Sequence, residues 1–173
     1  MDRKIDIIED LDGRKIVMIQ DIRFKGKRKI DWKEVEQYLK EYVGECYEII
    51  ENAEKVYIGP DFPDEFSWSN DTARLKGTLA KAKANAAQGI PELMQIATNE
   101  RYQENRKQKH KSDAENGWYR YTVHFALPVY NREGNLTTCN LFRIELLIRH
   151  AKNGKKYLYD MVNIKKETEN PHN

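Results

Sequence analysis

The sequence has 173 residues, of which 34% are charged and 39% hydrophobic, and a formal net charge of +2. This length suits one compact domain, and the hydrophobic content is too high for a disordered chain. No apolar run approaches the roughly 18 residues that a membrane span needs, and the first residues do not form a signal peptide. We therefore expect one cytoplasmic domain over residues 1–173 without membrane contact.

The two cysteines, Cys46 and Cys139, are far apart in the sequence. Neither a Cys-x-x-Cys pair nor a His-x-x-x-His pair occurs, so the spacing predicts no structural zinc site. Two free thiols fit a reducing compartment. The sequence indicates neither a metal nor a cofactor.

Basic residues are concentrated in a few segments although the net charge is small. Lysine and arginine dominate residues 22–33, 74–83, 101–111 and 143–156, whereas acidic residues gather elsewhere. Such segregation can give a nearly neutral protein a basic face, which suits nucleic acid.

The N-terminal third, residues 1–55, is expected to form a hairpin, a helix and a second hairpin. Asp12-Gly13 is a hairpin turn signal, and Asp31 followed by Glu34 is typical of a helix N-cap. The β-branched runs place strands at residues 4–8, 15–19, 47–50 and 55–58.

The middle of the chain is expected to be helical. Pro60 and Pro63 predict a loop over residues 60–66. A helix over residues 72–88, capped by Ser69 or Asp71, would present Leu75 and Leu79 on its apolar stripe. Pro91 is expected at the first position of another helix. The basic residues 101–111 show no apolar periodicity.

Three strands are expected at the C-terminal end, over residues 118–129, 136–149 and 156–164, joined by turns that include Asn153-Gly154. They would form an antiparallel meander, packed against the 72–88 helix through Leu75 and Leu79. The polar tail, residues 167–173, is expected to be frayed. Two or three helices beside such a sheet make an α+β fold.

Strand alternation places a set of polar side chains on one face of this sheet. A metal-independent ribonuclease needs a base, an acid and cations that stabilise the phosphate in the transition state. His and Glu suit the first two roles, and Arg the third, although any half-buried sheet carries charges on its solvated face. The set consists of Arg120, His124, Arg143, Glu145 and Tyr159.

Lys109-His110-Lys111 is a sharper local feature. Two neighbouring lysines would lower the pKa of His110, make it a better base near neutral pH and hold a phosphate. The alternative is a solvated basic turn. Further candidate phosphate contacts are Lys107 and, on the 72–88 helix, Arg74 and Lys81; Lys76 and Lys83 share another face of that helix.

Three motifs occur in an order that resembles a known family: Ser69-Asn-Asp-Thr72, Lys109-His110-Lys111 and Tyr157-Leu-Tyr-Asp-Met-Val-Asn163. Over residues 56–166 the sequence is similar to the large polyvalent protein-associated domains of the third type, from phages and conjugative elements. That family is similar to the barnase–EndoU–colicin–RelE nucleases. The resemblance implies a barnase/RelE-like sheet and site positions at Ser69, Thr72, Lys109, His110, Lys111, Tyr159 and Asp160.

Three functions remain open from the sequence. The first is a metal-independent endoribonuclease, a toxin or effector of a mobile element, which leaves 2′,3′-cyclic phosphate ends and has a matching immunity protein. The second is a non-catalytic phage or mobile-element protein that binds nucleic acid or a host defence ribonucleoprotein, as an anti-CRISPR-like inhibitor does. The third is a structural accessory domain without a ligand.

Overall fold

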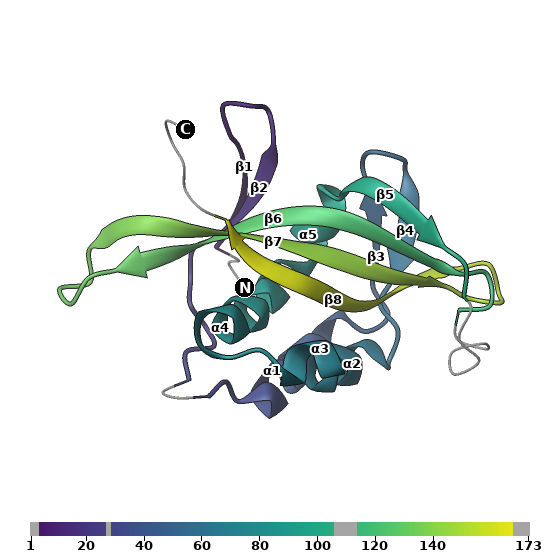
Figure 1. Cartoon of the computed structure of the whole chain (residues 1–173), viewed down its shortest axis with the longest axis horizontal. Helices are drawn as coiled ribbons and strands as arrows, with labels where there is room; N and C mark the ends of the chain where they lie inside the picture. The colour runs from purple at the N-terminus through teal and green to yellow at the C-terminus, as the bar shows by residue number, and fades with distance from the viewer. Residues whose placement is uncertain (1–3, 27–28, 106–113, 168–173) are drawn as a thin grey trace.

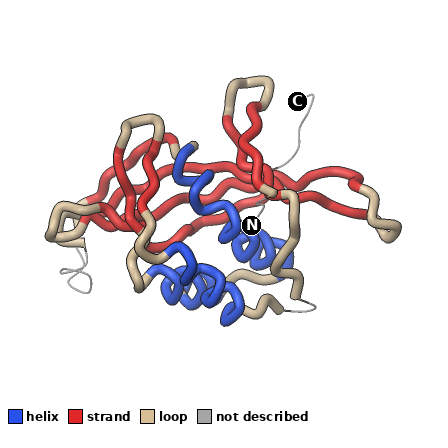
Figure 2. The backbone as a smooth tube through the Cα atoms, turned by 180° about the vertical axis from the view of Figure 1, so that it is seen from behind, coloured by secondary structure: helices blue, strands red, loops and turns tan. Residues whose placement is uncertain are grey.

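The computed structural model describes residues 4–26, 29–105 and 114–167. Eight strands within these ranges form one curled sheet, and the helices lie together on one side of it (Figure 1, Figure 2). The fold is therefore α+β, as the sequence predicts. None of the helices in the described ranges is long and apolar enough to cross a membrane.

The centre of the sheet consists of β6 (Trp118–Tyr130), β7 (Leu136–His150) and β8 (Lys156–Glu167). These strands pair antiparallel in chain order. Tyr121, Val123 and Phe125 of β6 are buried on the helix side. The residues between them are half-exposed, because successive side chains of a strand point to opposite faces.

The alternation of buried and exposed side chains in β8 is interrupted at one position, Met161. The register between β7 and β8 shifts twice, and Asn163 has a φ of 57°, which marks a bulge. Asp160 and Met161 are consecutive and both buried, with exposures of 2% and 0%. Leu158, Asp160, Val162 and Ile164 are buried together, as alternation predicts, so the residue buried out of phase is Met161.

The two N-terminal hairpins extend the central strands on both sides. The first comprises β1 (Ile5–Glu9) and β2 (Lys15–Ile19), and the second β3 (Cys46–Ile49) and β4 (Glu54–Tyr57). β2 lies parallel to β6, and β4 lies parallel to β8. The sheet is consequently mixed rather than purely antiparallel, and the N-terminal section is part of it.

A strand that the sequence does not predict, β5 (Thr98–Gln103), pairs with the first half of β6. Its polar side chains are mostly exposed, which explains why it lacks an apolar pattern. β5 places Arg101 opposite Arg120 of β6.

In the region of the first helices, the predicted N-cap is confirmed and the predicted loop is wrong. α1 (Trp32–Leu39) begins at Asp31, whose carboxylate accepts a 3.3 Å hydrogen bond from the Glu34 amide, and the short 3₁₀ helix η1 (Lys40–Tyr42) follows it. The predicted loop over residues 60–66 is wrong, because α2 spans Phe62–Trp68. Pro63 lies in the first turn of α2, where the helix needs no amide hydrogen from it.

The predicted 72–88 helix is divided. α3 (Asn70–Ala73) precedes α4 (Gly77–Ala86), and Gly77 adopts a φ of 58° at the junction. Leu75 and Leu79 are only partly buried against the core. Instead α4 is buried through small side chains, chiefly those of Ala82, Ala84 and Ala86, which allow a close approach to the sheet. The 3₁₀ helix η2 (Ala87–Gly89) leads to α5 (Ile90–Gln95), which carries the predicted proline in its first turn.

Candidate functional site

The sheet face opposite the helices, called the open face below, holds the polar side chains selected from the sequence. Thr122 lies opposite Glu145, and His124 lies opposite Arg143. Arg120 is two residues from Thr122 and shares this face. The structure thus brings Arg120, His124, Arg143 and Glu145 together as direct or diagonal cross-strand neighbours.

Glu145 is held by three donors on the open face. Its carboxylate lies 2.9 Å from Arg120 Nη1, 3.3 Å from Arg101 Nη2 and 2.9 Å from Asn163 Nδ2. Burial acts to raise the pKa of Glu145, but the hydrogen bonds from Asn163 and Arg120 and the two arginine charges outweigh it, so the pKa is lowered. Glu145 is therefore an ionised carboxylate near neutral pH.

His124 lies one diagonal position from Glu145. Its Nε2 atom is 3.2 Å from Glu167 Oε1 and 3.4 Å from Arg14 Nη1. Burial lowers the pKa of His124, and the charges of Arg14 and Arg143 lower it further, against the opposing effect of Glu167. The imidazole is therefore neutral at pH 7. Like Glu145, it is in the form of a base and cannot donate a proton as a general acid.

Two aromatic rings lie at the other end of the open face. The ring of Trp118 contacts that of Tyr159 edge-on, with centroids 5.1 Å apart. Both side chains are half-exposed. Exposed aromatic rings on a sheet can stack nucleic-acid bases, although cross-strand aromatic pairs also stabilise sheets.

Ser69 and Thr72, which the resemblance implies as site positions, act as a helix cap in this structure. The Ser69 hydroxyl accepts a hydrogen bond of 3.2 Å from the Thr72 amide at the start of α3. Thr72 is buried, and its hydroxyl donates to the Phe66 carbonyl. Thr72 therefore cannot contact RNA in this conformation.

Lys83, which the sequence suggests is on an exposed helix face, is completely buried. Its ammonium lies 3.1 Å from Asp71 and 3.0 Å from Asp160. Burial raises the pKa of Asp160 to about 6, although the Lys83 charge and hydrogen bonds from Ser69 and Lys83 act against it. The pKa of Asp71 is lowered because the Lys83 charge and the Asn163 amide outweigh its burial. In the sequence, only the alanines on both sides of Lys83 hint at this burial.

The remaining candidates are distributed elsewhere. Arg74 is exposed and forms a 3.0 Å ion pair with Asp71, while Lys81 is exposed on α4. Lys107, Lys109, His110 and Lys111 lie outside the described residues, so their role stays a prediction. No group of three metal-ligating side chains occurs within the described part of the chain.

Comparisons with known proteins add no relative. The chain matches no family model, no curated protein and no solved structure.

Proposed function

We propose that the open face binds single-stranded RNA. The proposal is carried by one arrangement, in which the aromatic pair Trp118–Tyr159 and the cations Arg120 and Arg143 occupy one continuous, half-exposed face. Aromatic rings stack unpaired bases, and arginines bind phosphates. Duplex nucleic acid would bury its base faces and leave the two rings without a stacking partner.

The sheet supports a second candidate, the metal-independent endoribonuclease of a barnase/RelE-like fold. His124 and Glu145 lie within one diagonal of each other and beside arginines. Both are in the base form, so the acid for the leaving 5′-oxygen must come from another residue. His110 would supply it or act as base, since its segment connects β5 to β6 and both strands contribute to the open face.

The biological role that we propose depends on whether the protein only binds RNA or also cleaves it. A protein that binds RNA without cleaving it would act on a host RNA or ribonucleoprotein, in the manner of a phage or mobile-element inhibitor. A protein that cleaves RNA would act as a toxin in the cytoplasm and need an immunity protein. Cleavage of RNA by purified protein therefore decides between them.

The stacking contribution tests RNA binding directly. Trp118→Ala should weaken binding of a short single-stranded RNA by about 5- to 150-fold, because each stacked base contributes roughly 1–3 kcal/mol. The matched control is Trp68→Ala, because Trp68 is exposed on α2 on the helix side and should not contact RNA. Equal affinities of wild type and Trp118→Ala in a fluorescence anisotropy titration would contradict the proposal.

Cleavage is tested on the same RNA. If the second candidate holds, His110→Ala or His124→Ala should slow cleavage by about 10²–10⁴-fold, which is the usual contribution of general acid–base catalysis. EDTA should have no effect, the product should carry a 2′,3′-cyclic phosphate, and DNA should resist. Intact RNA after incubation with folded wild-type protein would leave binding as the function.

A further inference from the structure

The neutral His124 and two cations, Arg143 and Lys165, form a row across the open face. His124 of β6 lies opposite Arg143 of β7, and Arg143 lies opposite Lys165 of β8. Among the described residues, neither Arg143 nor Lys165 has a carboxylate within ion-pair distance. Like charges directly opposite each other destabilise a sheet, so this row gains stability from a bound anion.

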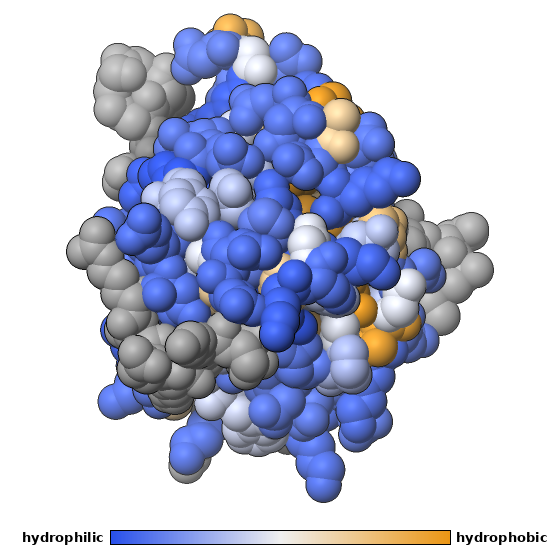
Figure 3. Space-filling view, turned by 90° about the vertical axis from the view of Figure 1, so that its right-hand side faces the viewer, coloured by the Kyte–Doolittle hydropathy of each residue, from blue (hydrophilic) through white to orange (hydrophobic). Residues whose placement is uncertain are grey.

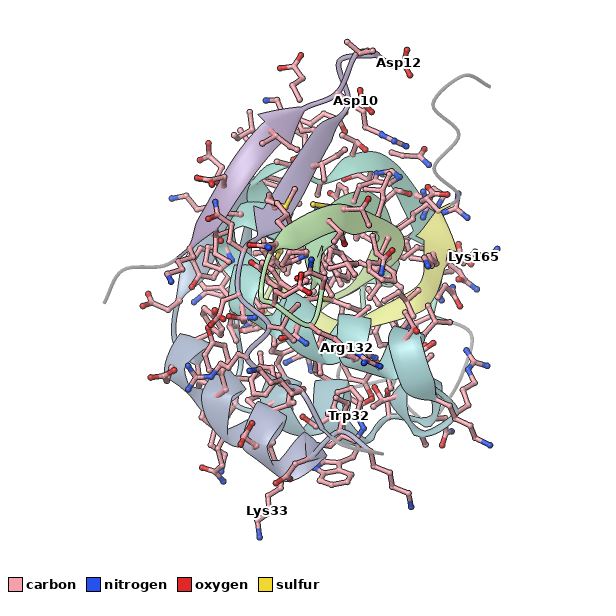
Figure 4. The ribbon with its side chains drawn as sticks, turned by 90° about the vertical axis from the view of Figure 1, so that its left-hand side faces the viewer. Asp10, Asp12, Trp32, Lys33, Arg132 and Lys165 are labelled. Carbon is pink, nitrogen blue, oxygen red and sulfur yellow. The ribbon has the colours of Figure 1, made fainter. Side chains whose placement is uncertain are left out.

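A hollow of about 320 Å³ adjoins this row. Its walls come from the α3–α4 connection and from β7 and β8, and they carry Asp71, Arg74, Leu75, Arg143, Glu145, Asn163, Ile164 and Lys165. The labelled side chain of Lys165 points outward from β8 (Figure 4). The volume is in the range of sites that hold small organic molecules and exceeds the need of a single small ion.

The two carboxylates of the hollow do not neutralise its cations. Asp71 contacts Lys83, Arg74 and the Asn163 amide. Glu145 contacts Arg120, Arg101 and the Asn163 side chain. Each carboxylate thus already has at least two cationic partners, which leaves Arg143 and Lys165 without a compensating carboxylate in the described part of the chain.

Asn163 connects these two carboxylates through hydrogen bonds. Its backbone amide donates to Asp71 at 3.2 Å, and its side chain donates to Glu145 at 2.9 Å. These contacts hold the bulge and orient Asp71 and Glu145 toward their own partners. The hollow is therefore lined by two carboxylates that have their own partners and by two cations, Arg143 and Lys165, without a carboxylate partner among the described residues.

We infer that this hollow binds a phosphate group of a nucleotide chain through Arg143, Lys165 and Arg74. The inference rests on the proposed function and specifies where a phosphate lies on the open face. Guanidinium and ammonium groups are the usual protein partners of phosphate, and a guanidinium binds two of its oxygens at once. The phosphate is either a terminal monoester or an internal diester of the RNA.

The experiment compares one short RNA with a 5′-phosphate, a 3′-phosphate or no terminal phosphate. Arg143→Gln and Lys165→Gln should each weaken binding about tenfold, as expected for loss of one charge-assisted hydrogen bond. The control, Lys166→Gln, alters the next residue of β8, which lies opposite the buried Phe142 and so on the other face. A loss confined to phosphorylated ends identifies a terminal monoester, and an equal loss for all three RNAs identifies a diester.

Two outcomes separate this inference from the proposed function. Unchanged RNA affinity in both variants, or an equal loss in Lys166→Gln, overturns the inference and leaves RNA binding intact. If no RNA binds, inorganic phosphate and uridine monophosphate are titrated while the backbone amides of Asn163 and Lys165 are followed by NMR. Shifts that saturate in wild type and vanish in Arg143→Gln retain the phosphate site without RNA binding, and unshifted amides overturn it.

Discussion

Two lysines near β8, Lys83 and Lys165, have opposite surroundings. Lys83 is completely buried between Asp71 and Asp160, with both carboxylates near 3 Å. Lys165 is exposed opposite Arg143, with no carboxylate in ion-pair distance among the described residues. Because a buried charge must be paired within the protein, Lys83 has a structural role, whereas the exposed Lys165 is available for the phosphate proposed above.

The molecular surface shows why hydropathy alone does not locate a site. Hydrophilic side chains cover most of the face in Figure 3, and hydrophobic ones are scattered among them. Charged side chains are common on every surface. Pairing distinguishes them, because a cation that faces another cation lacks the partner that most surface charges have.

The largest effect is expected from Lys83→Met. Removal of the ammonium leaves the buried Asp160 without its cation, and loss of one partner of a buried ion pair costs about 3–5 kcal/mol. Urea denaturation measures the loss. Lys81→Met is the control, since Lys81 is exposed on the same helix and should change stability by less than about 0.5 kcal/mol. A loss below about 1 kcal/mol for Lys83→Met would contradict a structural role.

The same cluster predicts a pH dependence. The pKa of Asp160 is about 6 in the folded state, against an ordinary value of 3.8. The unfolded chain therefore releases this proton first, and the contribution of Asp160 to stability falls as the pH rises from about 4 to about 6, by up to about 3 kcal/mol. The lowered pKa values of Asp71 and Glu145 act in the opposite direction.

Asp160→Asn isolates this effect from the opposing carboxylates. Asparagine does not titrate, so the stability of the variant relative to wild type should rise as the pH increases from 4 to 6. Denaturant midpoints at several pH values measure this difference. A difference that stays constant over this range would show that Asp160 has an ordinary pKa.

A smaller effect is expected from Glu145→Gln. The substitution frees Arg101 and Arg120 from their carboxylate while keeping the shape of the side chain. RNA binding should therefore tighten about fivefold, or roughly 1 kcal/mol. Glu133→Gln, in the exposed β6–β7 turn, has the same charge change and should have little effect. Equal tightening in both variants would indicate general charge rather than contact on the open face.

Local sequence signals predict much of the sheet. Asn153-Gly154 correctly marks the β7–β8 turn, and alternating residues of β6 and β7 correctly assign both faces. These signals act between near neighbours in the chain. The face that carries Arg120, His124, Arg143 and Glu145 follows from them.

Long-range pairing could not be predicted in this way. β5 is a strand because β6 offers it an edge, and Lys83 is buried because two distant aspartates compensate its charge. The bulge at Asn163 depends on contacts with Asp71 and Glu145. Each of these features requires residues from separate elements, and one sequence gives no sign of their proximity.

The most direct test of RNA binding by the open face is its salt dependence. If about four cations neutralise phosphates, the logarithm of the binding constant for single-stranded RNA should fall with the logarithm of salt concentration with a slope of roughly −3. The double variant Arg143→Gln, Lys165→Gln should reduce that slope to about −1.4, because each lost phosphate contact removes roughly 0.7. A wild-type slope near zero would contradict RNA binding by the open face, and equal slopes of wild type and double variant would remove Arg143 and Lys165 from the interface.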